Sequence, residues 1–190
     1  MRTVALLRGI NVGGSNKMSM AELKAVFETA GMTSVVTYIN SGNVVFSAEE
    51  ADRTRLTTIL EDAIARHFGL SINLLLLPED RARSIADAIP ASWTNDESMR
   101  CDVLYLWEDV DEPAVVDRIG LDPKIEDVLY TPGAVIRRVD RANATKSKLT
   151  RMMGTPLYKR MTIRNCNTAR KLAELVVPTT GSDLARVTTR

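Results

Sequence analysis

The pattern of apolar and polar residues in the first part of the chain predicts the element order β-α-β-β-α-β. Short apolar runs predict strands, and apolar residues at helical spacing predict two amphipathic helices. Ser19, with Glu22 three residues later, forms a capping-box pattern at the start of the first helix. Ser41-Gly42 predicts a tight turn between the two middle strands. The predicted strands are 3–8, 35–40, 43–47 and 71–77, and the predicted helices run from Ser19 to about residue 30 and from 51 to 68.

The second part of the chain repeats this order more faintly. After a predicted connecting helix and a loop, apolar runs again alternate with shorter helical patterns, and a last amphipathic segment predicts a C-terminal helix. The predicted strands are 102–107, 125–130, 134–139 and 157–163, and the predicted helices are 79–89, 112–119, a basic helix at 144–153, and 167–177.

This order predicts an α+β fold with two tandem ferredoxin-like halves, plus a C-terminal helix. The expected boundaries are 1–78 for the first half, 79–100 for a connecting helix and loop, 101–165 for the second half, and 166–190 for the C-terminal helix and tail. The segments 74–77 and 103–107 are apolar on both faces, and such strands need cover on both sides of the sheet. We therefore expect the halves to pack together as one unit.

Composition narrows the class of protein. The chain has 190 residues, of which 45% are hydrophobic and 26% are charged, as in an ordinary globular protein. No apolar run reaches the length of a membrane span, and no signal-peptide pattern follows Met1. Cys101 and Cys166 form no spacing motif, so we expect two reduced, semi-buried thiols in a cytoplasmic protein.

The net charge of +1 conceals a strong asymmetry along the chain. Residues 137–171 hold eleven Lys or Arg and one acid, whereas residues 79–127 hold fourteen acids and five basic residues. A basic segment of this kind is typical of an anion site or of a surface that contacts a nucleic-acid backbone. It is equally consistent with two segments that pair with each other, or with two solvated faces. The sequence leaves these interpretations open.

The loop from Arg8 to Lys17 is the first candidate site. A glycine-rich loop between a strand and a helix N-terminus can bind an anion through its backbone N–H groups. It is not a Walker A motif, because Ser15 and Asn16 stand where Lys and Ser or Thr are required. The alternative is a structural turn capped by Asn11 and Asn16. The candidate ligand-binding residues here are Arg8, Asn11, Gly13, Gly14, Asn16 and Lys17.

A second polar motif, Asn40-Ser-Gly-Asn43, is read first as a hairpin turn. From the expected topology we place this hairpin at the sheet end away from the first loop. The two polar motifs should then not meet within one half of the protein.

The third candidate lies near the C-terminus. Lys148, Arg164 and Asn165 belong to a basic and polar region, and Asn165 or Asn167 is the expected N-cap of the last helix. An anion at that helix start would have Arg164 as a fork-shaped donor. The alternative is a capped surface helix with solvated basic side chains.

Catalysis finds little support in the residue types. His67 is the only histidine, and no Cys/His pair or metal-ligand cluster appears, so no metal or cofactor is expected. The first strand carries no aromatic residue, which argues against RNA recognition by base stacking on the sheet. The leading hypothesis is a protein that binds a small phosphorylated or otherwise anionic ligand through the first loop. The alternatives are nucleic-acid backbone binding by residues 137–171 and an enzyme acting on a phosphorylated substrate, for which no general base can be named.

Two long motifs, Arg8-Gly-Ile-Asn-Val-Gly-Gly and Tyr38-Ile-Asn-Ser-Gly-Asn-Val-Val-Phe46, resemble the bacterial family known as domain of unknown function 1697. The resemblance continues at 102–106, 147–150 and 162–168. It implies an α+β fold and a soluble cytoplasmic protein, and it implies no particular activity. The chain differs from the family pattern at Cys166, where an aromatic residue, typically Trp, is usual.

Overall fold

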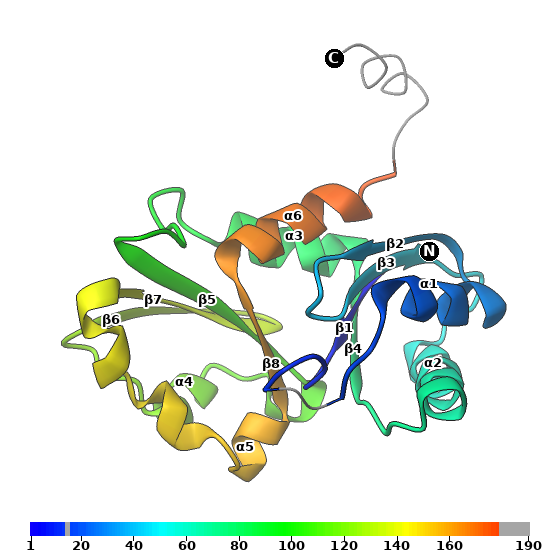
Figure 1. Cartoon of the computed structure of the whole chain (residues 1–190). Helices are drawn as coiled ribbons and strands as arrows, with labels where there is room; N and C mark the ends of the chain where they lie inside the picture. The colour runs from blue at the N-terminus through cyan, green and yellow to red at the C-terminus, as the bar shows by residue number, and fades with distance from the viewer. Residues whose placement is uncertain (14–15, 179–190) are drawn as a thin grey trace.

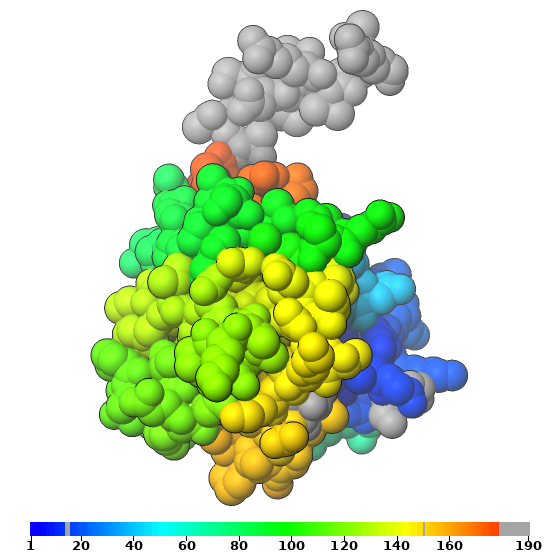
Figure 2. Space-filling model, turned by 90° about the vertical axis from the view of Figure 1, so that its left-hand side faces the viewer, coloured from blue at the N-terminus to red at the C-terminus, as the bar shows by residue number. Residues whose placement is uncertain are grey.

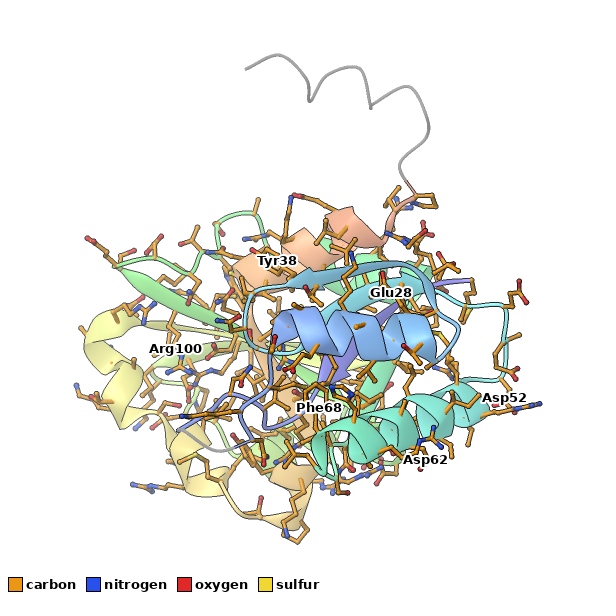
Figure 3. The ribbon with its side chains drawn as sticks, turned by 45° about the vertical axis from the view of Figure 1, so that its right-hand side comes forward. Glu28, Tyr38, Asp52, Asp62, Phe68 and Arg100 are labelled. Carbon is orange, nitrogen blue, oxygen red and sulfur yellow. The ribbon has the colours of Figure 1, made fainter. Side chains whose placement is uncertain are left out.

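The N-terminal half is a four-stranded antiparallel sheet with two helices on its outer face. The computed structural model describes residues 1–13 and 16–178 (Figure 1). The strands lie in the order β2-β3-β1-β4, and Figure 3 shows α1 and α2 side by side over the sheet. The elements are β1 (Arg2–Leu7), α1 (Met20–Thr29), β2 (Thr33–Tyr38), β3 (Asn43–Ser47), α2 (Arg53–Phe68) and β4 (Leu74–Pro78).

The C-terminal half is a second four-stranded antiparallel sheet, in the order β6-β7-β5-β8. The fold is therefore α+β, as predicted, with two separate antiparallel sheets. Helix α3 (Glu79–Asp87) joins the halves, and α6 (Cys166–Val176) follows the last strand. The other elements are β5 (Met99–Leu106), η1 (Glu108–Val110), α4 (Val115–Ile119), β6 (Glu126–Thr131), β7 (Ala134–Asp140), η2 (Arg141–Lys146), η3 (Lys148–Met152), α5 (Pro156–Lys159) and β8 (Met161–Asn165).

Three apolar clusters account for the packing of these elements. One lies between the first sheet and α1 and α2, and another covers the outer face of the second sheet. The third is shared by the inner faces of both sheets and by α3 and α6, which pack on each other across the two halves (Figure 1). Strand β4 is apolar throughout because both of its faces are packed. Leu74 and Leu76 face the first cluster, and Leu75 and Leu77 face the shared one.

The local predictions at helix starts are confirmed. The Ser19 hydroxyl accepts a hydrogen bond from the Glu22 N–H at the start of α1. The side chain of Asn165 accepts one from the Thr168 N–H at the start of α6. Each cap satisfies a backbone donor that has no acceptor inside the helix, which explains why these positions mark the helix starts.

The prediction of one basic helix at 144–153 is wrong. Two short 3-10 helices, η2 and η3, occupy this region, with Ser147 between them. The hydroxyl of Ser147 is buried and hydrogen-bonds to Arg137 and Glu126. A side chain fixed to the sheet at this point interrupts a continuous helix.

The predicted strand at 157–163 is also wrong in its first part. Residues Pro156–Lys159 form α5, whose N-cap Thr155 accepts a hydrogen bond from the Tyr158 N–H. Proline at the first helical position and a threonine cap both favour a helix start. Strand β8 begins only at Met161, opposite Leu106 of β5.

The hairpin connection is longer than the predicted two-residue turn. Strand β2 ends at Tyr38, and β3 starts at Asn43, so residues 39–42 form the turn. The Asn43 side chain donates to the Tyr38 carbonyl at 3.0 Å, which closes this wider turn.

Within residues 1–13 and 16–178, no helix has the length and apolar character needed to span a membrane.

Candidate functional site

The first loop and the β2–β3 hairpin meet at one end of the first sheet, so the prediction that they lie at opposite ends is wrong. Strands β1 and β3 are antiparallel, and Leu6 near the end of β1 pairs with Asn43 at the start of β3. The hairpin that precedes β3 therefore lies beside the loop that follows β1. The Asn11 side chain donates to the Asn40 carbonyl at 2.9 Å and joins the two motifs directly.

Asn11 and Asn16 build the loop from within. Both have positive φ angles, 52° and 48°, which asparagine tolerates better than most residues. The Asn11 amide donates to the Met18 carbonyl at 3.0 Å, and its oxygen accepts from the Met18 N–H at 2.8 Å. The Asn16 side chain donates to the Gly9 carbonyl at 2.9 Å. These bonds agree with the structural interpretation of both residues as turn-capping side chains.

A groove of about 760 Å³ lies where the loop, the hairpin and the start of α1 come together. Lys17 is exposed on its wall, and it has no ion-pair partner within the described part of the chain. The first-turn N–H groups of Met20 and Ala21 have no acceptor inside the helix, as at any helix start. Glu22 adds one negative charge. The residues that line the groove are Asn11, Lys17, Met18, Ser19, Met20, Glu22 and Asn40.

The structure describes only one of the two glycines that were predicted to hold an anion. Gly13 has a φ of 59° and open space around its α-carbon, so its backbone is accessible. Gly14 lies outside the described residues. Gly13 is not among the residues that line the groove.

Arg8 contacts the other half of the protein rather than the groove. Its Nε donates to the Met161 carbonyl at 3.1 Å, and its Nη2 donates to the Tyr158 carbonyl at 3.2 Å. The guanidinium also lies 5.4 Å from the centre of the Tyr158 ring, within the range of a cation–π contact. Figure 1 shows the loop reaching toward α5, and in Figure 2 the N-terminal segment lies against the segment that precedes α5.

Arg164 is a buried link between the halves, and the structure does not place it as a surface donor at the start of α6. Only 8% of Arg164 is exposed, and it faces the first sheet from β8. Its Nε donates to Asn43 Oδ1 at 2.5 Å, and its Nη2 donates to the Leu7 carbonyl at 2.8 Å and, more weakly, to that of Gly42 at 3.4 Å. Burial lowers the pKa of Arg164 to about 10.

The remaining donors of Arg164 bind β8 itself. Its Nη1 donates to the Thr162 hydroxyl at 3.0 Å and to the Ile163 carbonyl at 2.8 Å. Every nitrogen of the guanidinium thus has an acceptor within the protein. The contacts of Arg164 with Asn43 and Leu7 form a joint between the two halves. Gly42 allows the close packing at this joint, because a Cβ there would lie 2.7 Å from side-chain atoms of Ile10 and Leu7.

The other predicted C-terminal residues do not join the groove. Asn165 has its side chain engaged as the N-cap of α6. Lys148 is exposed at the start of η3 and is not among the residues that line the groove. The eight predicted site residues that the structure describes therefore fall into three groups: those of the loop and the groove, those that link the two halves, and those at surface or capping positions.

The basic segment pairs with the acidic segment, which is one of the alternatives that the sequence left open. Arg138 contacts Asp127 at 2.5 Å, and Arg160 contacts Asp109 at 2.6 Å. Arg137 is buried and pairs with both Asp102 and Glu126. The exposed basic residues of this segment that lack an ion pair within the described residues are Arg141, Lys146, Lys148, Arg151 and Lys159.

The network around Arg137 was missed by sequence reasoning. Arg137 Nη2 donates to Asp102 Oδ2 at 3.0 Å, and Nη1 donates to Glu126 and to the Ser147 hydroxyl. The only signal was two adjacent arginines, Arg137 and Arg138, in the otherwise apolar run 134–139. No group of residues suited to a metal ion occurs in residues 1–13 and 16–178.

Comparison with known proteins identifies the family. The model of a family described as "Protein of unknown function (DUF1697)" matches residues 1–136. The chain belongs to this family. A solved structure, that of the conserved bacterial protein SP0830 from Streptococcus pneumoniae, is 30% identical, with a TM-score of 0.77. The match covers 93% of this chain and 98% of that one. No curated protein matches the chain.

The family match gives the motifs of the resemblance a structural context. The two long motifs contain Arg8 and Asn43, which contact β8 and Arg164 across the joint. The matched region includes the groove and the hairpin and ends before Arg164.

Proposed function

We propose that the protein binds a small phosphorylated or otherwise anionic ligand in the groove formed by the first loop, the β2–β3 hairpin and the start of α1. The observation that carries this proposal is the convergence of the two polar motifs beside Lys17. The groove volume of about 760 Å³ lies within the range of small-molecule sites, about 300–1,000 Å³.

The charges of the groove favour a ligand with both an anionic group and hydroxyl groups. Lys17 supplies a positive charge, and the first-turn N–H groups of α1 supply donors for an anion. Glu22 and the side chain of Asn40 can accept hydrogen bonds from hydroxyl groups. A sugar phosphate or a nucleotide therefore fits this set better than inorganic phosphate alone.

The other predicted residues have supporting roles in this proposal. Asn11 and Asn16 hold the loop in shape, and Gly13 lies in the same loop with an accessible backbone but outside the residues that line the groove. The role predicted for Gly14 lies outside the described residues. Arg8 and Arg164 keep the two halves in register around the site, and Asn165 and Lys148 play no direct part.

Thermal unfolding against a panel of phosphate, sugar phosphates, nucleotides and short oligonucleotides tests the proposal. A ligand present at 100 times its dissociation constant adds about 2.7 kcal/mol to the free energy of unfolding. Lys17→Ala removes one charge-assisted bond and should weaken binding about 10-fold or more. Glu22→Gln should strengthen binding of the same ligand, because it removes a repulsive charge.

Lys24→Ala is the matched control. Lys24 lies on α1, whereas Lys17 lies in the loop before it; Lys24 is exposed and forms only a weak ion pair with Glu28 at 3.8 Å. It is not among the groove residues, so its removal should leave ligand binding unchanged. Equal binding by Lys17→Ala and Lys24→Ala would exclude this groove as the site.

Nucleic-acid binding by residues 137–171 has weaker support, because Arg137, Arg138 and Arg160 are already paired with acids. An enzyme acting on a phosphorylated substrate lacks a general base in the groove beyond Glu22. An oligonucleotide that stabilises the protein at low salt, and loses its effect as salt rises, would favour the nucleic-acid alternative instead.

We also propose that each half, 1–78 and 101–165, is a ferredoxin-like unit, that 79–100 connects them, and that 166–190 forms the C-terminal helix and tail. The strand orders β2-β3-β1-β4 and β6-β7-β5-β8 support this assignment. The free thiols of Cys101 and Cys166 support a location in the cytoplasm.

A further inference from the structure

Two buried cysteines lie opposite each other at the start of α6. Strands β5 and β8 pair antiparallel, with Val103 opposite Arg164 and Asp102 opposite Asn165. Cys101 precedes Asp102 on β5, and Cys166 follows Asn165 as the first residue of α6, so the two cysteines are neighbours just beyond this last pair. The Cα atoms of an antiparallel pair lie about 4.5–5.5 Å apart, and a disulfide requires about 4.4–6.8 Å.

The two thiols also touch. Cys101 and Cys166 belong to the apolar cluster shared by the two sheets, and both are free. The thiols of Cys101 and Cys166 are close enough to shift each other's pKa. The Cys166 S–H is directed to the Trp93 carbonyl at 3.8 Å and to Asn167 Oδ1 at 3.6 Å. Figure 1 shows α6 starting directly at the end of β8, beside β5.

The surroundings of Cys166 favour its thiolate. The hydrogen bond from Cys101 lowers the pKa of Cys166 to about 7, burial opposes this shift, and the charge of Arg170 adds to it. Arg170 Nη1 lies 3.7 Å from the Cys166 sulfur. Cys166 is also the first residue of α6, where the helix N-terminus favours a negative charge.

Cys101 has the opposite character. Its hydrogen bond to Cys166 and its burial both raise the pKa of the Cys101 thiol, and the nearby carboxylate of Asp102 acts in the same direction. Cys101 therefore stays protonated while Cys166 ionises. Cys166 is therefore the nucleophilic sulfur, and Cys101 is a neighbouring thiol that can form a disulfide with Cys166 once Cys166 has been oxidised.

We propose that Cys101 and Cys166 form a redox-reactive dithiol that a small hydroperoxide converts to an intramolecular disulfide. The Cys166 thiolate attacks one oxygen of the peroxide, so that an S–O bond forms, the O–O bond breaks and hydroxide leaves. Sulfur is oxidised to the sulfenic acid, and the peroxide is reduced by two electrons. The Cys101 sulfur then attacks Cys166, the S–S bond forms, and the S–O bond breaks with loss of water, which takes up the Cys101 proton.

The burial of both sulfurs limits the oxidant to a small molecule. Cys101 and Cys166 are 0% exposed, and the backbone of Trp93 lies over Cys166, with its carbonyl 3.8 Å from the sulfur. Hydrogen peroxide is therefore the probe of choice. The disulfide ties the start of α6 to β5, so the oxidised protein should unfold at a higher temperature than the reduced one.

The experiment treats the whole reduced protein with hydrogen peroxide and measures its intact mass, its thiols after denaturation, and its oligomeric state. The expected product is a monomer that has lost two hydrogen atoms and both thiols, and that recovers both with a reductant. Its rate of formation should rise with pH and level off above about pH 7, whereas an unperturbed thiol would continue to gain reactivity past about pH 8.5.

Two variants separate the roles of the sulfurs. Cys101→Ser should stop at a sulfenic acid on Cys166 that dimedone traps, and Cys166→Ser should resist oxidation under the same conditions. Cys101 and Cys166 that both remain free in the treated protein would overturn the proposal. Disulfide-linked dimers would overturn it as well. So would a wild-type protein that accumulates the same sulfenic acid as Cys101→Ser.

Discussion

The joint between the halves gives the sharpest test of the packing. In Arg164→Met the apolar stem of the side chain is kept, and the guanidinium is lost. Asn43 Oδ1 and the Leu7 carbonyl in the first half then lose a buried donor, and the Thr162 hydroxyl and the Ile163 carbonyl lose theirs within β8. The variant should be destabilised, because these acceptors lie out of reach of bulk water.

The magnitude follows from two opposing terms. Four hydrogen bonds of 3.0 Å or less are lost, and bonds from a charged donor contribute at least about 1.5 kcal/mol each. The buried charge is costly in itself, as its pKa of about 10 against a normal 12.5 indicates, and its removal returns about 3 kcal/mol. We expect a net loss of about 3 kcal/mol.

Urea denaturation measures this loss. With a slope of about 2–3 kcal/mol per molar urea, the midpoint should fall by about 1 M or more. Arg151→Met is the matched control, since Arg151 is exposed on η3, and its removal should change stability by less than about 0.5 kcal/mol. If the two variants have the same midpoint, Arg164 does not stabilise the joint, and the reasoning fails.

Three further variants test other parts of the structure. Gly42→Ala should lose at least about 2 kcal/mol in urea denaturation, because the new methyl group clashes at 2.7 Å and φ is +71°; a fully stable variant would contradict the close approach of Ile10 and Leu7 to this glycine. Arg137→Met should lose about 3–5 kcal/mol, because the carboxylate of Glu126 stays buried without an ion-pair partner and Asp102 keeps only the partly exposed Arg100, and a variant as stable as the wild type would show that Glu126 is not charged in the fold. Hydrogen bonds from Thr94 and Ser98 hold the pKa of Asp96 well below its usual range, so the stability that Asp96 contributes is present above about pH 4 and is lost as pH falls further. Asp96→Asn should therefore differ from the wild type at neutral pH and converge with it in acid, and a difference that does not change with pH would be evidence against this.

The sequence predicted the order of most elements because local signals agreed with one another. Ser19 and Asn165 cap the helices that they were expected to cap, and the doubly apolar segment 74–77 forms β4 between two apolar clusters. The pattern that predicted one helix at 144–153 gave the wrong result, because the buried hydroxyl of Ser147 interrupts the helix there. That hydroxyl contacts Arg137 and Glu126, which lie 10 and 21 residues earlier in the chain, on strands β7 and β6.

The candidate site was predicted less completely, because its parts meet through strand pairing. The end of the sheet at which the hairpin lies follows from the antiparallel pairing of β1 with β3, which brings the hairpin beside the first loop. Arg164 was expected at the surface because arginine is rarely buried. Its burial follows from acceptors that come from Leu7 and Asn43, more than a hundred residues away in the chain.

Binding of an anionic ligand in the groove beside Lys17 is tested most directly by calorimetric titration. Isothermal titration calorimetry of the wild type, Lys17→Ala and Lys24→Ala would use the sugar phosphate or nucleotide that gives the largest thermal shift. Lys17→Ala should bind this ligand about 10-fold or more weakly than the wild type, while Lys24→Ala should bind it like the wild type. Equal affinities for all three proteins, or no member of the panel that binds at all, would contradict this prediction.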